Sequence, residues 1–520
     1  MQTQVIRVPH YCFHQPVPMR DGVELSAIVT HPEKAGEYAC VLMRTPYNAK
    51  VFVNLVEALL EKVPYAFVIQ DTRGRYDSQG KRFIPLREKE DSLDTFAWIK
   101  KQPWSNGRVI VFGPSYLGYA ALQVLDDECD CIDAVFAPMT FTRPDDGLVY
   151  RSGVLQLHWA LPWAIMTSTR TQASLKLING SWPEAYRGPL KEQVKQLGWP
   201  QHIWDKFLTP LESKMWEDAR IHFKKPLKSR VCLIGGWYDF LLGGTLNSYE
   251  DLMAANGMKP DLILGGWGHN GYLQSLSGVG DFDLGERGRG HAMKDFLDLI
   301  ERAKSESQQL IRAYILRADR WLKLDSWPPS SIVEEKLFLG CGYDLLDKPP
   351  EEEMEFGIPV EPSDPVPTIG GSVWEFPPHL EPGPADQSSL NDRPDNIRFI
   401  SPQTKESKTI LGPIHAKLWV AAPADNTHFT AKLTLITEEK ERIIQDGIAT
   451  IDSCKNDATS ISIDLLATGL EIRKGERLGL HISWSNFPKY ALPELNKPIL
   501  QSVFVSDSMP SHVSLPFLDD

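Results

Sequence analysis

The sequence predicts an α/β protein with a second half made of β-strands. In the first part of the chain, short apolar runs alternate with amphipathic stretches, as expected of a mostly parallel sheet covered by helices. Each run ends at a polar or Gly/Pro loop, where open α/β sheets place their functional groups. Beyond about residue 310 the pattern changes to short segments of alternating polarity, which is typical of antiparallel strands.

The first four strands are predicted from four apolar runs: Ala39–Met43, Tyr65–Ile69, Val109–Phe112 and Ala134–Ala137. Residues 143–228 then show helix-like spacing without a convincing strand, so we expect a helical insertion that interrupts the sheet. The apolar segment Val154–Met166 within it is expected to be a buried helix or pocket lining. Strands resume at Val231–Ile234 and Leu262–Leu264.

The second half contains alternating segments such as Phe429–Ile436 and Leu478–Trp484. Their spacing predicts a β-sandwich or jelly roll. We therefore divide the 520 residues into an α/β domain (1–142 and 229–310), a helical cap or lid (143–228) and a β-sandwich domain (311–520).

The formal charge of −13 excludes an extended basic surface, so neither nucleic acid nor an anionic membrane is an expected partner. A homo-oligomer stays open. No apolar stretch approaches the roughly 18 residues that would span a bilayer. The seven scattered cysteines and a start without the plan of a signal peptide predict a cytoplasmic location.

One segment reads as a strand, an abrupt turn and a helix: Gly113-Pro-Ser115-Tyr-Leu-Gly118 after an apolar run. Such a turn presents a serine nucleophile, although the second glycine falls one place later than in the usual G-x-S-x-G pattern. Taken alone, an ordinary tight turn explains this segment better than a nucleophile does.

The next two strand ends deliver Asp239 and then His269. Taken alone, these are a helix N-cap and a turn histidine. Together with Ser115 they follow the chain order of an α/β-hydrolase triad, in which His269 accepts the serine proton and Asp239 orients the imidazole. The expected oxyanion donors are the Tyr116 backbone N–H and the Tyr47 phenol, for which a surface turn residue is the alternative.

These segments resemble the cocaine-esterase-like and X-prolyl dipeptidyl-peptidase-like serine hydrolases. The resemblance covers nearly the whole chain and rests on six motifs: Arg44-Thr-Pro-Tyr47, Asp71-Thr-Arg-Gly74, Gln102-Pro-Trp-Ser-Asn-Gly107, Gly113-Pro-Ser-Tyr-Leu-Gly118, Gly235-Gly-Trp-Tyr-Asp239 and Gly266-Trp-Gly-His269. It explains the displaced glycine, because this family carries G-x-S-Y-x-G. It implies Ser115, Asp239 and His269 as the triad, Tyr47 and Tyr116 as the oxyanion hole, a helical cap and a C-terminal jelly roll.

Four tryptophans are candidates for an aromatic substrate pocket: Trp159, Trp163, Trp237 and Trp267. Core packing is an equal alternative for each. Because the alternating His10, Cys12 and His14 lack a fourth ligand nearby, we expect neither a metal nor another cofactor.

The sequence thus predicts a serine hydrolase that forms an acyl-enzyme on Ser115 and cleaves a small ester, an amide or a short peptide. X-Pro dipeptidyl-peptidase activity and acyl transfer use the same triad and stay open as alternatives. A non-catalytic protein that binds a ligand through its β half is the alternative from another class.

Overall fold

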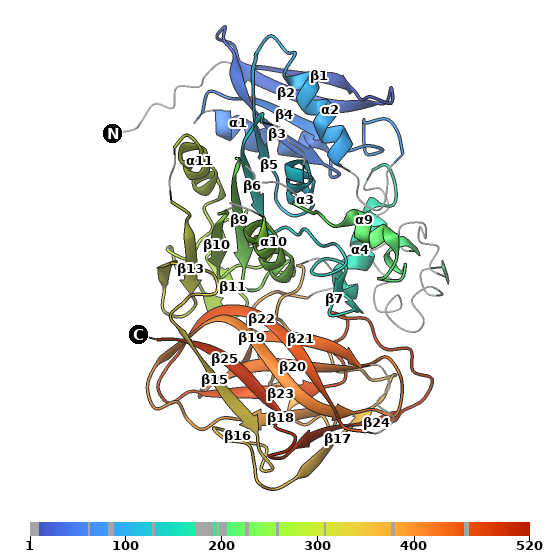
Figure 1. Cartoon of the computed structure of the whole chain (residues 1–520), viewed down its shortest axis with the longest axis vertical. Coiled ribbons are helices and arrows are strands. Elements are labelled where there is room, and N and C mark those ends of the chain that lie inside the picture. The colour runs from blue at the N-terminus through green and yellow to red at the C-terminus, as the bar shows by residue number, and fades with distance from the viewer. Residues whose placement is uncertain are drawn as a thin grey trace.

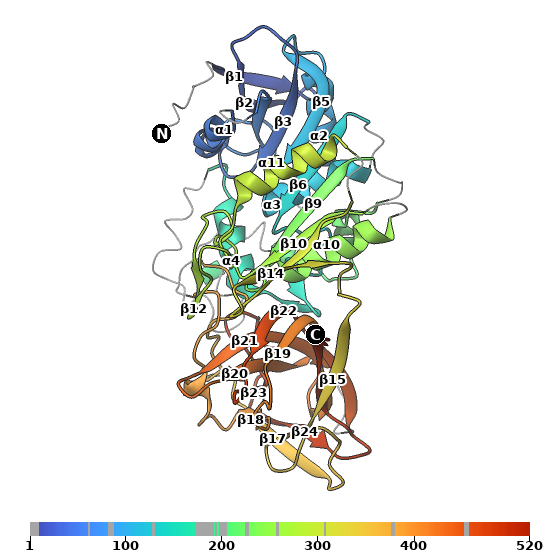
Figure 2. The same cartoon turned by 90° about the vertical axis from the view of Figure 1, so that its left-hand side faces the viewer.

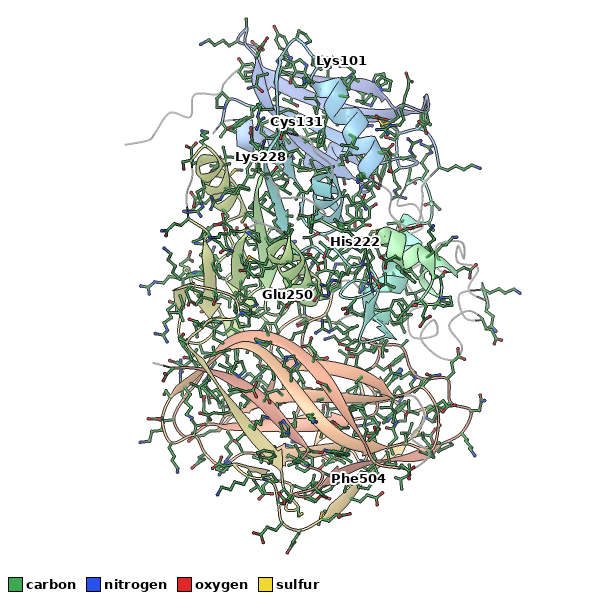
Figure 3. All side chains as sticks on the ribbon, in the orientation of Figure 1. Lys101, Cys131, His222, Lys228, Glu250 and Phe504 are labelled. Atoms are coloured by element: carbon green, nitrogen blue, oxygen red, sulfur yellow. The ribbon has the colours of Figure 1, made fainter. Side chains whose placement is uncertain are left out.

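The computed structural model describes residues 10–60, 63–81, 88–126, 130–171, 192, 195–196, 205–223, 228–255, 259–305, 308–375, 380–451 and 457–519. Much of the predicted cap, from residue 172 to residue 204 apart from 192, 195 and 196, lies outside the described residues. An α/β half and an all-β half lie end to end along the long axis of the molecule (Figure 1). Charged side chains such as Lys101 and Lys228 lie on the outside (Figure 3).

A sheet of ten strands forms the α/β half. Its order is β1 (His10–Pro18), β2 (Glu24–Pro32), β4 (Ala66–Asp71), β3 (Tyr38–Thr45), β5 (Ser105–Phe112), β6 (Ile132–Pro138), β9 (Arg230–Gly236), β10 (Asp261–Gly265), β13 (Ile311–Ile315) and β14 (Arg320–Leu324). Neighbours from β4 to β13 pair in parallel, whereas the β1–β2, β2–β4 and β13–β14 pairs are antiparallel. The six runs predicted as strands are confirmed, and their near-continuous apolar character follows from burial on both faces.

Helices cover both faces of this sheet. They are α1 (Val53–Leu60), α2 (Lys89–Ile99), α3 (Tyr116–Leu122), α10 (Leu242–Ala254) and α11 (Ala292–Ala303). Helix α11 packs on one face of β6 and β9, and α3 and α10 lie on the other (Figures 1 and 2). Because parallel strands end at the same edge of a sheet, the loops after β3, β5, β9 and β10 converge there.

The segment between β6 and β9 contains a two-residue hairpin, β7 (Tyr150–Arg151) and β8 (Val154–Leu155), then α4 (Leu157–Thr167) and α9 (Lys214–Ala219). The sequence did not predict the hairpin, because strands of two residues leave no apolar period. Every residue of α4 is buried, as expected for a segment that is apolar all round.

The second half is a sandwich of antiparallel sheets. The larger sheet has the order β16 (Leu345–Leu346), β15 (Ile332–Leu339), β25 (His512–Leu518), β19 (Lys408–Ala421), β24 (Ile499–Val505) and β17 (Met354–Val360), and β22 (Thr459–Ile472) also pairs with β19. The smaller sheet has the order β18 (Asn396–Ile400), β23 (Arg477–Ser483), β20 (Thr427–Ile436) and β21 (Glu441–Ile451). The predicted change of character to β structure is confirmed.

The first sheet extends past the boundary that we placed at residue 310. Strands β13 and β14 follow that residue, yet β13 pairs in parallel with β10 and β14 pairs with β13. The chain returns through α11 to the same sheet, so β13 completes a strand–helix–strand unit. In sequence, the apolar run of β13 resembles strands of the α/β half and strands of the all-β half equally. The three-part division itself stays a prediction. Within the described ranges, no helix is long and apolar enough to cross a membrane.

Candidate active site

Ser115 occupies the turn between β5 and α3, in a backbone conformation that side chains rarely adopt. Its φ is 58° and its ψ is −129°. Such a conformation costs on the order of 1–3 kcal/mol and persists only where the surroundings impose it. Here the Ser115 N–H donates to the Pro138 carbonyl at 2.8 Å, and the Thr140 hydroxyl donates to the Ser115 carbonyl at 3.1 Å. The turn holds the serine side chain at the wall of a cavity.

Two glycines make this turn possible. A Cβ on Gly113 would lie 2.4 Å from the backbone carbon of Leu117, and one on Gly118 would lie 2.7 Å from the Thr140 side chain. Leu117, between them in the chain, instead lines the cavity. The glycine is needed at 118 and not at 117, because 118 is the position that faces the neighbouring strand end.

Asp239 and His269 follow β9 and β10, and backbone hydrogen bonds tie their two loops together. The Trp237 N–H donates to Gly265 at 2.8 Å, and the Tyr238 N–H donates to Trp267 at 3.1 Å. A Cβ on Gly236 would lie only 2.3 Å from the Trp267 carbonyl oxygen, so the approach requires glycine there.

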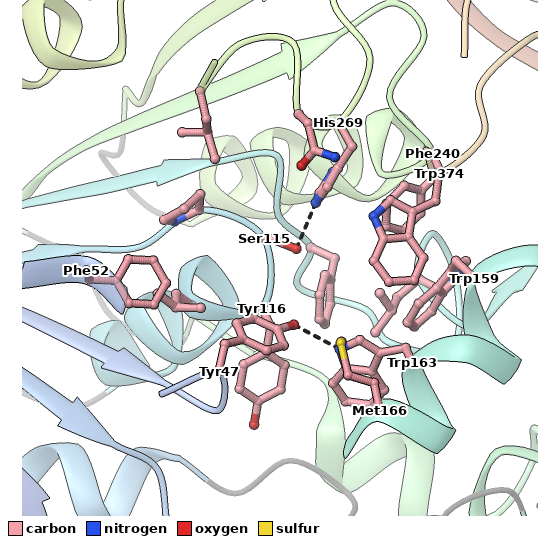
Figure 4. A pocket seen from close by; sticks show the side chains of 16 residues that line it. Tyr47, Phe52, Ser115, Tyr116, Trp159, Trp163, Met166, Phe240, His269 and Trp374 are labelled. Carbon is pink, nitrogen blue, oxygen red and sulfur yellow. Dashed lines mark hydrogen bonds between the residues drawn. The ribbon is translucent and has the colours of Figure 1, made fainter. Parts of the chain in front are cut away.

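The three side chains predicted as a triad form a continuous path of hydrogen bonds. His269 Nε2 lies 3.1 Å from Ser115 Oγ, and His269 Nδ1 lies 2.8 Å from Asp239 Oδ1 (Figure 4 shows the first of these). A carboxylate only accepts, so Nδ1 carries the proton and Nε2 is left to accept from the serine. Asp239 is fully buried, and its Oδ1 also accepts the Leu241 N–H.

The charges around His269 favour its protonated form. Burial alone would lower the pKa of the imidazole, but the charge and hydrogen bond of Asp239, together with the charge of Glu375, outweigh it. The pKa of His269 is therefore raised above its ordinary value of 6.5. An imidazole in this environment is stabilised when it takes up a proton.

Tyr47 follows β3, and its hydroxyl oxygen accepts a hydrogen bond of 2.9 Å from the Trp163 indole on α4 (Figure 4). Its loop is held from the segment after β4. Asp71 Oδ1 accepts the Ala49 N–H at 2.7 Å, and Arg75 donates to the Pro46 carbonyl at 2.8 Å. Burial raises the pKa of the Asp71 carboxyl to about 6. The sequence identified the motif that begins at Asp71, but it did not predict that this motif holds the Tyr47 loop.

Tyr116 is the first residue of α3, where backbone N–H groups lack an acceptor within the helix. Its phenol points away from Ser115 and donates to Glu88 at 2.5 Å, so the phenol is not directed at the nucleophile, and the oxyanion role of the Tyr116 backbone N–H stays a prediction. The structure thus brings Tyr47, Ser115, Tyr116 and His269 to one cavity.

This cavity has a volume of about 310 Å³. Its walls are mainly aromatic and aliphatic: Tyr47, Phe52, Pro114, Ser115, Tyr116, Leu117, Phe141, Leu148, Trp159, Trp163, Met166, Phe240, His269, Asn270, Leu273 and Trp374. None of these described lining residues is Asp, Glu, Lys or Arg. Across the described ranges, no cluster of three His, Cys, Asp or Glu side chains is arranged to hold a metal ion.

Of the four tryptophans proposed from sequence, Trp159 and Trp163 line the cavity and the other two do not. Trp237 and Trp267 are buried beneath the loops, where their indoles donate to the carbonyls of Tyr314 and Gly288. Their placement in the pocket was wrong, because a position beside Asp239 or His269 does not reveal to which side of the loop a side chain turns.

Phe240 and Trp374 line the cavity but were missed. The Phe240 ring centroid lies 4.7 Å from that of His269 and 5.6 Å from that of Trp159. Its place directly after Asp239 was a usable signal. Trp374 comes from the all-β half, and no local pattern connects it with residues in the first half.

Comparisons with known proteins find matches to both halves of the chain. Residues 21–271 match the family described as X-Pro dipeptidyl-peptidase (S15 family), and residues 301–501 match the family described as X-Pro dipeptidyl-peptidase C-terminal non-catalytic domain. These two matches together cover most of the chain, which resembles the S15 family in both of its halves. The chain is a serine hydrolase of esters or amides, and the family resemblance stated from the motifs is confirmed.

Among curated relatives, cocaine esterase from Rhodococcus sp. (strain MB1 Bresler) is 26% identical over 534 residues, covering 91% of this chain and 90% of that protein. Among solved structures, an aminopeptidase from a marine sediment Thaumarchaeota archaeon has a TM-score of 0.83 at 19% identity, covering 100% of this chain and 98% of that one. An α-amino acid ester hydrolase has a TM-score of 0.80 at 19% identity, covering 99% and 98%. These structures show that the S15 hydrolase has the predicted α/β-hydrolase fold with a C-terminal β-rich domain.

Proposed function

We propose that this S15 hydrolase uses Ser115 as its nucleophile, with His269 as general base and Asp239 as the carboxylate that orients it. The observation that carries the proposal is the hydrogen-bonded path from Ser115 through His269 to Asp239, which starts at the wall of an apolar cavity. A serine hydroxyl is a weak nucleophile at neutral pH and needs such a base.

In the first half-reaction, Ser115 Oγ attacks the carbonyl carbon of the substrate while His269 Nε2 takes the hydroxyl proton. The tetrahedral intermediate collapses, the bond to the leaving group breaks, and the leaving group takes that proton from His269. In the second, His269 removes a proton from water, which attacks the acyl-enzyme. The acid leaves, and Ser115 Oγ recovers its proton.

The oxyanion of each intermediate would accept hydrogen bonds from the Tyr116 backbone N–H and the Tyr47 hydroxyl. The indole N–H of Trp163 is a donor only, so the Tyr47 oxygen accepts in that bond. The bond from Trp163 thus orients the Tyr47 hydroxyl beside the cavity.

The cavity favours a neutral, apolar acyl group. An X-Pro dipeptide carries a free ammonium, and burying a charge without a partner is expensive. The described lining residues offer aromatic rings and no carboxylate. An ester or amide of an apolar acid therefore suits this site better than an X-Pro peptide.

The test of the nucleophile is covalent labelling with a fluorophosphonate, measured by intact-protein mass. We expect one adduct on the wild type and none on Ser115→Ala. Ser152→Ala is the matched control, because Ser152 also has a positive φ, of 48°, but is exposed and lies outside this cavity. An unlabelled wild type that is folded, or equal labelling of Ser115→Ala, would contradict the assignment.

The test of the substrate class compares an aryl ester of an apolar acid with an Xaa-Pro amide that bears a free amino terminus. We expect the larger kcat/KM for the ester. A preference for the Xaa-Pro amide would make the enzyme a peptidase, and product formation on an added alcohol or amine would reveal acyl transfer from the same acyl-enzyme.

We also propose that the protein works in the cytoplasm. Cys12, Cys40, Cys232 and Cys341 are free thiols, as a reducing compartment favours. Cys131, the residue before β6 (Figure 3), is disulfide-bonded, and this observation argues against a cytoplasmic location. Cell fractionation decides between the cytoplasm and an oxidising compartment.

A further inference from the structure

Glu375, in the all-β half, binds the loop that carries His269. Its Oε1 accepts the Asn270 backbone N–H at 3.0 Å, and its Oε2 accepts the Asn270 side-chain amide at 3.2 Å. On the other side of His269, a Cβ built on Gly268 would lie 2.9 Å from Glu375 Oε1. The carboxylate thus binds the residue after His269 and lies close to the residue before it.

Glu375 also acts on His269 through its charge. Asp239 binds the imidazole at Nδ1 and the neutral ring of Phe240 packs against it, while Glu375 acts on it through its charge from beside the loop. Burial raises the pKa of the Glu375 carboxyl, against the opposing effects of the charge of His269 and the Asn270 N–H. A half-buried carboxylate at this place favours the imidazolium that forms during the reaction.

The all-β half holds the Asp239 loop as well. The Trp237 carbonyl, two residues before Asp239, accepts hydrogen bonds from Gln445 at 2.5 Å and from Ser372 at 3.2 Å. The Ser372 hydroxyl also lies 3.1 Å from the side-chain oxygen of Gln445, so its single proton is shared between that oxygen and the Trp237 carbonyl. Both the acid and the base loops therefore rest on side chains from the second half.

We propose that Glu375 is a positioning residue of the active site: it fixes the His269 loop through Asn270 and supplies negative charge to the imidazole. The family that residues 301–501 match is described as a non-catalytic domain, which means that it supplies no reacting group. It leaves room for this half to set the geometry and basicity of His269. The inference rests on the proposed role of His269.

An alternative task for Glu375 is to bind the ammonium group of a substrate. Both of its oxygens are engaged by Asn270, and Glu375 is not among the residues that line the cavity, whereas its neighbour Trp374 is. The geometry therefore points to the loop and not to the substrate.

Two substitutions separate the effects of charge and contact. Glu375→Gln keeps an acceptor for the Asn270 N–H and loses the charge, so we expect the acid limb of kcat/KM to move to lower pH by about 0.3 to 1 unit, with kcat near the wild-type value at high pH. Glu375→Ala loses both, so kcat should also fall by roughly tenfold, with little change in KM. Glu381→Gln, an exposed glutamate in the same segment, is the matched control and should leave the profile unchanged.

The measurement is the pH profile of kcat and kcat/KM on a neutral aryl ester, with fluorophosphonate labelling of each variant. An unmoved acid limb in Glu375→Gln, or a loss confined to substrates with a free ammonium, overturns the inference. If Glu375→Ala does not fold, the Glu375→Gln profile decides alone. A wild type that labels at Ser115 while the variants keep its profile refutes only the role of Glu375. A wild type that does not label refutes the proposed nucleophile.

Discussion

The turn that carries Ser115 and the loop that carries His269 are organised in opposite ways. The serine turn depends on its own residues and on the adjacent strand end: Gly113, Gly118 and Thr140 impose its conformation. The histidine loop is held from a distance, by Glu375, which lies 105 residues beyond Asn270 in the chain. The position of Ser115 thus depends on nearby residues, whereas the position of His269 depends on the association of the two halves.

This difference has a physical cause. A nucleophile needs one strained backbone conformation, which a strand, a tight turn and a helix can impose by themselves. A general base needs an orientation and a pKa, and both depend on charges that only the folded molecule brings together. Substitutions should therefore act differently on the two sites.

The largest expected effect is a loss of kcat on substitution of Tyr47. The Tyr47 loop, like the His269 loop, is held by residues from another segment of the chain. Tyr47→Phe removes one oxyanion donor and should lower kcat by roughly 10²- to 10³-fold with little change in KM. Steady-state kinetics on an apolar ester measures this. Tyr38→Phe is the control, because that phenol bonds to the Lys34 carbonyl, outside the cavity. A loss below about threefold in Tyr47→Phe would remove Tyr47 from the oxyanion hole.

A smaller effect is expected from breaking the local turn. Gly118→Ala places a methyl group 2.7 Å from the Thr140 side chain and 2.8 Å from the Gly113 carbonyl oxygen. Overpacking of this kind costs about 1–3 kcal/mol of folding free energy. We expect a lower midpoint in chemical denaturation and slower labelling of Ser115. Wild-type values of both would show that the turn relaxes without cost.

The smallest effect is a displacement of the pH profile of the wild-type enzyme. His269 must be neutral to accept the serine proton, and its pKa is raised above 6.5. The protonated, inactive form therefore accumulates as the pH falls through that raised pKa, so kcat/KM should be constant at higher pH and decline tenfold per unit below it. An acid limb at or below pH 6.5 would contradict the electrostatic environment described for His269.

The same contrast explains what the sequence could predict. Ser115, Asp239 and His269 each stand at the end of a recognisable apolar run, so local patterns and chain order brought them together. Their roles as a triad remain proposals. Trp237 and Trp267 stand at equally recognisable places, yet the direction of a side chain depends on packing that sequence order does not contain.

Two of the residues that sequence reasoning missed have partners that lie far along the chain. Glu375 and Trp374 belong to a segment without helical or strand periodicity, and their meaning arises only when the two halves meet. The first sheet extends past residue 310 for a related reason, because the apolar run of β13 does not indicate which sheet the strand joins. Local apolar runs were sufficient to predict where strands form. They did not reveal which sheet each strand joins.

The distance between Asn270 and Glu375 along the chain also bears on synthesis of the protein. The ribosome synthesises the Ser115 turn and the loops of Asp239 and His269 before it reaches Glu375, whose carboxylate anchors the His269 loop. A nascent chain in which only the first half has emerged therefore carries the reacting groups without their support. Full activity would therefore appear only after the second half has folded against the first.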